Sequence, residues 1–257
     1  MTIRSAVLGA GLLAAAAAQA RAQAVQLRFT PPVGQVTRYL EMNELWPTGR
    51  PMDIPAVVTV HSTRTIVAMD SENYVVRTVV NSTEMSVPGG GAHRPGAGED
   101  LLRGMVSTQR MDARGRILST AVTPPPGLPP QLAASLQRSA ASSNIRGTVV
   151  LPERAVSLRE TWTDSIVNSA SGDRGPPIQV VFLVTFTFER LEQEGGARRA
   201  IISMAGSQQG GLTGSVTGEL TVDLVAGRLE HMVTNMMVQT EARGPLTRAR
   251  ITTETVP

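Results

Sequence analysis

The chain has 257 residues, with 24 Lys and Arg against 21 Asp and Glu, three His and no Cys. This length suits one large domain or two small ones, and it is enough to bury a hydrophobic core. Every cationic residue is Arg, so the high isoelectric point of about 10.4 reflects guanidinium chemistry, whereas a net charge of only +3 and 3% aromatic residues argue against nucleic-acid binding.

Residues 1–24 have the features of a bacterial Sec-type signal peptide. Arg4 supplies the positive charge, residues 5–18 form an uncharged apolar stretch, and Ala22-Gln23-Ala24 is a small-x-small cleavage site. An uncleaved membrane anchor is the alternative, but a spanning helix needs roughly 20 apolar residues. We therefore predict cleavage before Val25, a periplasmic or secreted location, and no integral membrane span after cleavage. Without Cys, this chain has no disulfide to stabilise it.

Alternation of apolar and polar residues dominates the rest of the chain. It is clearest in residues 178–189 and 212–224. Successive side chains of a strand point to opposite faces, so these segments are predicted to be half-buried antiparallel strands. Similar segments are residues 35–45, 57–69, 74–85, 106–111, 116–122, 160–167, 198–205, 228–241 and 247–253.

Turn sequences separate many of these segments. They comprise residues 70–73, 112–115, 194–196 and 225–227, which are rich in Gly, Asp and Asn. Roughly ten strands joined mostly by short turns predict an antiparallel meander. The longest strands favour a long curved sheet, open or a half-barrel. We therefore predict a mainly β protein in which residues 25–257 form a single domain with one or two short helices.

One helix is predicted near residues 128–143. It follows a run of Pro, and Leu132, Leu136 and Ala140 recur at four-residue spacing to form one apolar stripe. The helix either caps an open end of the sheet or covers a ligand cavity as a plug or lid. Residues 87–98 are rich in Gly and Pro and are predicted to form a long loop.

Residues suited to catalysis are few. His61, His93 and His231 are the only imidazoles, and none belongs to a zinc motif. Residues 214–218 (Gly-Ser-Val-Thr-Gly) resemble a nucleophile elbow, but the strand pattern continues through them and no helix follows. Glu41 and Glu44 fall on opposite faces of a predicted strand, which separates this carboxylate pair. We predict no enzymatic activity, no metal and no cofactor.

Methionine is frequent. Met232 and Met236 fall on one face of the predicted strand 228–241. Met side chains are flexible and polarizable, so they suit either irregular core packing or a cavity that accepts varied apolar ligands. The sequence leaves both interpretations open.

Four stretches resemble an uncharacterised family of exported bacterial proteins. The family patterns are an opening Val-Gly-x-x-x-x-Tyr, a central strand with an Asp-x-x-Gly turn, a Leu-Pro-x-x-x-Val segment before a Trp, and a closing hairpin. The corresponding stretches are residues 32–39, 102–105 with 111–117, 151–156 with 161–163, and 218–223 with 227–229. In one place the chain departs from the pattern: Leu158-Arg159-Glu160 stands where the family has Val-x-x-Gly-Asp/Glu, and the Gly is missing.

The resemblance implies an architecture similar to the lipoprotein-carrier half-barrel of LolA- and LolB-like proteins. In that architecture a curved antiparallel sheet wraps around helices and has an apolar concave face. The family supplies no catalytic residues, and a carrier function follows only by analogy of fold.

From these observations we predict a non-enzymatic exported β-protein that binds an apolar ligand, such as a lipid or acyl chain, on the concave face of its sheet. The alternative is a structural or protein-interaction module of the cell envelope without a ligand cavity, and a hydrolase would require His61 or His231 beside two acids. The predicted lining of the ligand site consists of Ile178, Val180, Phe182, Val184, Phe186, Phe188, Met232 and Met236.

Overall fold

The structure is a computed structural model that describes residues 24–46, 54–70, 72–86, 102–142, 149–170, 178–210, 212–239 and 246–257. The predicted signal peptide, apart from Ala24, lies outside the described residues. The predicted Gly- and Pro-rich loop, including His93, also lies outside them.

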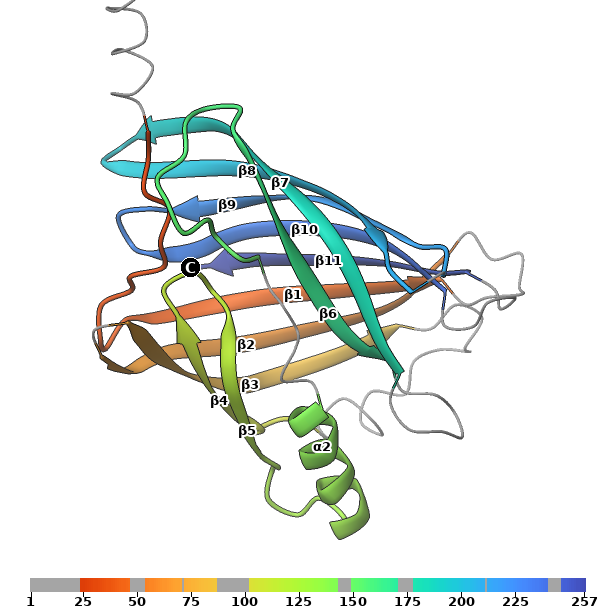
Figure 1. Ribbon diagram of the computed structural model, residues 1–257. Helices are drawn as coiled ribbons and strands as arrows, with labels where there is room; N and C mark the ends of the chain where they lie inside the picture. The colour runs from red at the N-terminus through yellow and green to blue at the C-terminus, as the bar shows by residue number, and fades with distance from the viewer. Residues whose placement is uncertain are drawn as a thin grey trace, which may run out of the picture.

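The described strands form one antiparallel sheet that curves but does not close (Figure 1). Its spatial order is β5-β4-β3-β2-β1-β11-β10-β9-β8-β7-β6. Two meanders, β1 to β5 and β6 to β11, therefore join through the pairing of β1 with β11. The strands are β1 (Val36–Trp46), β2 (Ala56–Met69), β3 (Asn73–Ser86), β4 (Val106–Asp112), β5 (Ile117–Thr123), β6 (Thr161–Ala170), β7 (Ile178–Glu194), β8 (Ala197–Gln208), β9 (Ser215–Asp223), β10 (Arg228–Gln239) and β11 (Leu246–Val256).

The prediction of a mainly β fold on one long, curved, open antiparallel sheet is confirmed. Each predicted strand is present, and most boundaries differ by one to three residues. The largest difference is β7, which continues past Glu189 to Glu194 through a bulge between Phe188 and Arg190. A bulge adds one residue to a strand and shifts the alternation, which hides the continuation from a strict period of two.

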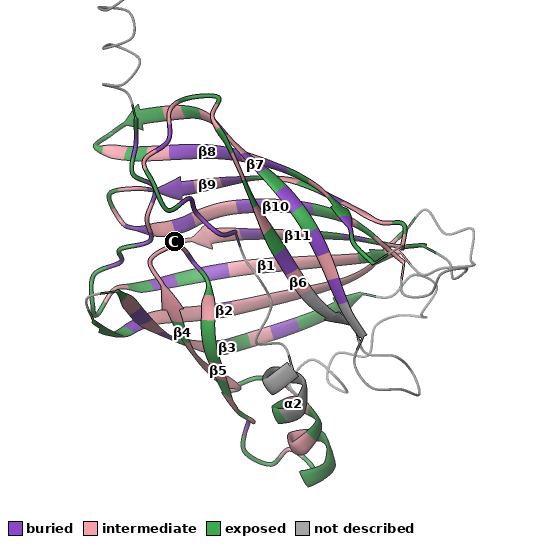
Figure 2. Ribbon diagram, viewed as in Figure 1, coloured by how far each residue is buried: buried purple, intermediate pink, exposed green. Residues whose placement is uncertain are grey.

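Strand β7 shows why these sequences form strands. Val180, Phe182, Val184 and Phe186 are buried, whereas Leu183 on the other face is exposed (Figure 2). The same alternation recurs in β9, where a buried apolar face opposes Thr and Glu side chains. Burying one face of each strand is the main contribution to stability in a sheet of this kind.

The helix α2 (Pro130–Ser142) begins two residues later than predicted. Its first turn contains Pro130, where the missing N–H costs no intrahelical hydrogen bond. Figure 1 shows α2 next to β5, outside the curve of the sheet. Leu132 of the predicted apolar stripe is 48% exposed. The side chain of Ala140 is not among those that the structure describes.

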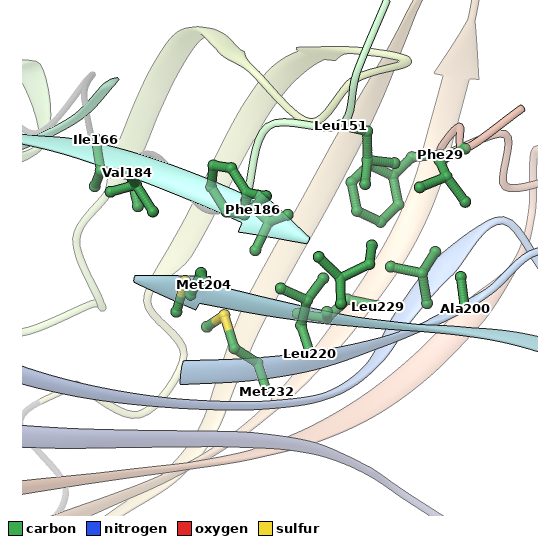
Figure 3. Close-up of a cluster of buried hydrophobic side chains, with 14 of the residues drawn as sticks. Phe29, Leu151, Ile166, Val184, Phe186, Ala200, Met204, Leu220, Leu229 and Met232 are labelled. Carbon is green, nitrogen blue, oxygen red and sulfur yellow. The ribbon is translucent and has the colours of Figure 1, made fainter. Parts of the chain in front are cut away.

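Two extended segments cross the concave face of β6 to β10 and complete the core. Residues 25–29 and 149–156 pair with each other through Val25 and Val156, whose backbone groups exchange hydrogen bonds of 2.8 and 3.0 Å. Leu27 and Leu151 are fully buried. Figure 3 shows Phe29 and Leu151 lying across from Leu220 and Leu229 of the sheet.

Trp162 of β6 fixes the second segment to the sheet. Its ring stacks on Phe186 with centroids 5.5 Å apart. Its indole Nε1 donates a hydrogen bond of 2.8 Å to the carbonyl oxygen of Val150. The aromatic face therefore packs in the core while the polar atom is satisfied by backbone.

Ion pairs link the two open edges of the sheet at one end. Arg114, in the turn between β4 and β5, lies 3.4 Å from Asp164 of β6 and 2.6 Å from Glu153. Arg116 lies 3.0 Å from the same Asp164 carboxylate. The sheet therefore curves far enough for its first and last edges to approach each other here.

Arg159 stands at the Gly position of the Val-x-x-Gly-Asp/Glu pattern to which the sequence was compared. Its φ of 66° is the only positive φ among described residues other than Gly, in a region that costs about 1–2 kcal/mol for a residue with a Cβ. The backbone N–H donates to the carbonyl oxygen of Phe188 at 2.7 Å, and the exposed guanidinium pairs with Glu189. The turn is therefore formed without the Gly.

We expect Arg159→Gly to raise the free energy of unfolding by about 0.5–1 kcal/mol, because Gly adopts this φ without strain. The lost ion pair is exposed and contributes little. Urea unfolding measures the change. Arg159→Ala is the control, since it removes the ion pair and keeps the strain. Equal stabilisation by Ala and Gly would show that the backbone conformation is not the cause.

Candidate functional site

The predicted ligand lining lies in the packed core of the sheet. Phe182, Val184, Phe186 and Phe188 have no exposed surface, and Val180 is 2% exposed. Apolar residues of the segments 25–29 and 149–156 belong to the same buried cluster as these side chains. The side chain of Ile178 lies outside the described set.

The two predicted Met residues lie in the same core. Met232 is 8% exposed, and Met236 packs against the buried cluster. The structure thus brings the described members of the predicted set together. None of them lines the cavity described next, and their role in binding a ligand stays a prediction.

A cavity of about 340 Å³ occupies the other half of the concave face. Strands β1 to β4 form its floor, and the turn before β10 and the segments 25–31 and 149–156 contribute to its walls. It is lined by Phe29, Pro31, Gln35, Thr37, Tyr39, Glu41, Val60, Ser62, Arg64, Ile66, Tyr74, Val76, Thr78, Val80, Met105, Ser107, Gln109, Met111, Gly115, Ile117, Val149, Gly227, Arg228 and Leu229.

The lining mixes apolar walls with a few charged and phenolic groups. Alternate residues of each strand face the cavity, as the two-residue period requires. Met105 and Met111 belong to this lining, so two Met residues of the chain do face a cavity. The charged members are Arg64, Arg228 and Glu41, so two positive charges and one negative charge leave the lining with a net charge of +1.

Tyr39 lies close enough to both Arg residues to be affected by their charge. The guanidinium carbon of Arg64 lies 4.2 Å from the centre of the Tyr39 ring, a cation–π distance. The phenol donates a hydrogen bond of 2.8 Å to the carbonyl oxygen of Leu229. Burial raises the pKa of Tyr39, and the positive charges of Arg64 and Arg228 partly oppose that shift. The phenol is therefore a neutral donor near neutral pH.

Tyr74 of β3 also contributes a neutral phenol. Burial raises the pKa of Tyr74 well above its usual range, and the negative charge of Asp112 acts in the same direction. Neither phenol of the lining supplies an anion to the cavity.

Thr37 joins the two arginines. Its backbone is directly opposite Arg64 in the register of β1 and β2. Its hydroxyl oxygen accepts a hydrogen bond of 3.1 Å from Nη1 of Arg228. A second hollow of about 500 Å³ adjoins this point, and Thr37 and Arg228 line both spaces. The two arginines therefore converge on one end of the cavity.

The described imidazoles face away from the cavity. His61 lies between Val60 and Ser62, which both line it, so its side chain is on the opposite face of β2. His231 precedes the buried Met232 on β10, so its side chain lies on the face opposite that core residue. Across the described residues, no group of three or more His, Cys, Asp and Glu is arranged to hold a metal ion.

The two acidic residues of β1 lie on opposite faces of the strand. Glu41 faces the cavity and accepts a hydrogen bond of 2.9 Å from Asn43, whereas Glu44 lies near Arg250 on the other face. The predicted separation of this pair is confirmed. Glu189 lies within β7, which continues to Glu194, and its carboxylate accepts a hydrogen bond of 2.6 Å from the Ser203 hydroxyl.

Known proteins give no further guide to this site. No family model, curated protein or solved structure matches the chain. Within the described ranges, no helix has the length and apolar character needed to cross a membrane.

The sequence analysis did not predict this cavity, although the residue pattern of two strands indicates it. The face of β1 that contains Thr37, Tyr39 and Glu41, and the face of β2 that contains Ser62 and Arg64, are mixed in character. The face of β7 is uniformly apolar. A uniformly apolar strand face is typical of a packed core, whereas ligand cavities are mostly apolar with a few polar groups.

Proposed function

We propose that the protein is an exported, non-enzymatic binding protein that holds an apolar ligand, such as a lipid or acyl chain. The cavity on the concave side of β1 to β4 is the observation that supports this most directly. Its volume of about 340 Å³ is at the lower end of the range of small-molecule sites. It is large enough for an alkyl chain but not for a macromolecule.

The chemistry of the lining supports the apolar class of ligand. Val60, Ile66, Val76, Val80 and Met105 contribute apolar surface to its walls. Each buried methylene of a ligand gains about 0.8 kcal/mol on leaving water. An alkyl chain gains the most from walls of this kind.

Export is supported by the sequence of residues 1–24 and by the position of Val25. Val25 is buried and bonded to Val156, whereas Ala24 is exposed. Cleavage between them leaves Val25 as the new amino terminus. Its nitrogen still donates to the Val156 carbonyl, so the proposed cleavage is compatible with the fold.

Native mass spectrometry of the protein purified from a bacterial periplasm tests the proposal, together with organic extraction. We expect a mass that corresponds to cleavage before Val25 and a co-purified lipid or acyl chain. A bare protein that also fails to bind an apolar fluorescent probe would contradict the proposal and favour the protein-interaction alternative.

A substitution that fills the cavity separates it from other apolar surfaces. We expect Val60→Trp to weaken binding of an apolar fluorescent probe by at least about tenfold, because Val60 lines the cavity and the indole takes the space of the ligand. Thr59→Trp is the matched control, since the adjacent residue points to the other face of β2. Fluorescence titration measures both. Unchanged binding to Val60→Trp would place the probe elsewhere.

A further inference from the structure

The floor of the cavity contains a polar row that runs across four strands. Thr37 of β1 pairs with Arg64 of β2, Arg64 pairs with Thr78 of β3, and Thr78 pairs with Ser107 of β4. All four residues line the cavity. Arg228 extends the row, because its guanidinium donates to the Thr37 hydroxyl.

Apolar residues lie on both sides of this row. Ile66 and Val76 pair with each other on one side, and Val80 lies near Met105 on the other side, where the Val80 N–H donates to the Met105 carbonyl at 3.0 Å. All four line the cavity. The site is therefore amphipathic, with hydroxyl and guanidinium groups in one row and apolar walls along the rest.

The two guanidinium groups of the row have no acidic partner among the described residues. Neither Arg64 nor Arg228 forms an ion pair with a described carboxylate. The Nε atom of Arg228 is buried and has no hydrogen-bond acceptor. A charged donor that is buried without a partner is costly, so this end of the cavity is suited to an incoming acceptor.

Glu41 is too far along the strand to serve as that partner. It lies four residues from Thr37 on the same face of β1, which corresponds to about 13 Å. Its carboxylate is also bonded to Asn43. Glu41, the one acidic residue of the lining, therefore does not neutralise the two arginines.

We propose that the ligand is an anionic amphiphile whose carboxylate or phosphate group is bound by Arg64 and Arg228 while its alkyl chain occupies the apolar walls. This proposal rests on the proposed function and names the class of ligand. Guanidinium groups form paired, charge-assisted hydrogen bonds with either kind of oxyanion. Thr37, Thr78 and Ser107 offer hydroxyl donors beside them.

Three ligands with the same twelve-carbon chain test this inference: dodecanoate, dodecyl phosphate and dodecanol. Isothermal titration calorimetry, below the micelle concentrations of the two anions and the solubility limit of dodecanol, gives each Kd. We expect at least one of the anions to bind about tenfold or more tightly than the neutral alcohol. The tighter anion then identifies the headgroup as carboxylate or phosphate.

Variants of the two arginines assign the preference to this site. In the double variant Arg64→Gln and Arg228→Gln, the preference for the anion should fall below about threefold while the Kd of dodecanol changes little. Arg77→Gln is the control for loss of a positive charge outside the cavity, because Arg77 is exposed on the other face of β3. Arg64→Lys keeps the charge and should retain most of the preference. Thermal unfolding of each variant confirms that it is folded.

The outcomes separate this inference from the proposed function. Dodecanol that binds as tightly as both anions, or a preference that survives in the double variant, overturns the anionic assignment and leaves an apolar binding protein. If none of the three ligands binds, the proposed function fails as well.

Discussion

Gly115→Ala is expected to lower the free energy of unfolding by about 2–5 kcal/mol. Gly115 ends the Asp-x-x-Gly turn between β4 and β5 with a φ of +92°. A Cβ there would lie 2.7 Å from the carbonyl oxygen of Val149 and 2.8 Å from the ring of Phe29. The left-handed backbone costs Ala about 1–2 kcal/mol, and overlap with packed atoms adds typically 1–3 kcal/mol.

Gly104→Ala is the matched control for this substitution. Its φ of +81° is similar, but no described atom lies within 4 Å of the position of a Cβ. We expect a loss of about 1–2 kcal/mol there, from the backbone alone. Chemical denaturation of both variants measures the difference. Equal losses would contradict the close approach of residues 25–29 and 149–156 to the β4–β5 turn.

Phe186→Ala is expected to destabilise the protein by about 3–5 kcal/mol, which is typical of a buried Phe whose ring is removed from a packed core. Phe186 has no exposed surface and stacks on Trp162. Leu183→Ala on the same strand is the control. Its side chain is 49% exposed on the opposite face, so we expect a change within about 0.5 kcal/mol.

Chemical denaturation again gives the two values. A loss at Leu183 as large as that at Phe186 would show that the two faces of β7 are assigned incorrectly. A small loss at Phe186, accompanied by weaker ligand binding, would instead support the original prediction that the β7 stripe lines a ligand site.

The strands and turns of this fold were predictable because their causes are local. Alternation in residues 178–189 and the Asp-x-x-Gly turn before β5 depend only on neighbouring residues. The pairing of β1 with β11 depends on residues far apart in the chain, and no local pattern encodes it. The curvature that brings Asp164 close to Arg114 and Arg116 also depends on contacts between distant parts of the chain.

The site was less predictable than the sheet for a related reason. Two irregular segments contribute to both the core and the cavity walls, and their apolar residues, such as Leu27 and Leu151, follow no strand or helix period. They pack into the uniformly apolar cluster, where burial gains most. Arg64 and Arg228 are both neighbours of Thr37, one through the register of β1 and β2 and the other through a side-chain hydrogen bond, and neither relation follows from a local sequence pattern.

The most direct test of the account is the crystal structure of the protein with a dodecanoate brominated at its terminal carbon. Anomalous scattering locates the bromine independently of how the alkyl chain of the ligand is fitted to the density. We expect the bromine beside apolar residues of the β1 to β4 cavity, such as Val80 or Ile66, and the carboxylate near Arg64 and Arg228. Bromine in no ordered position, or bromine inserted against β7, would contradict the account.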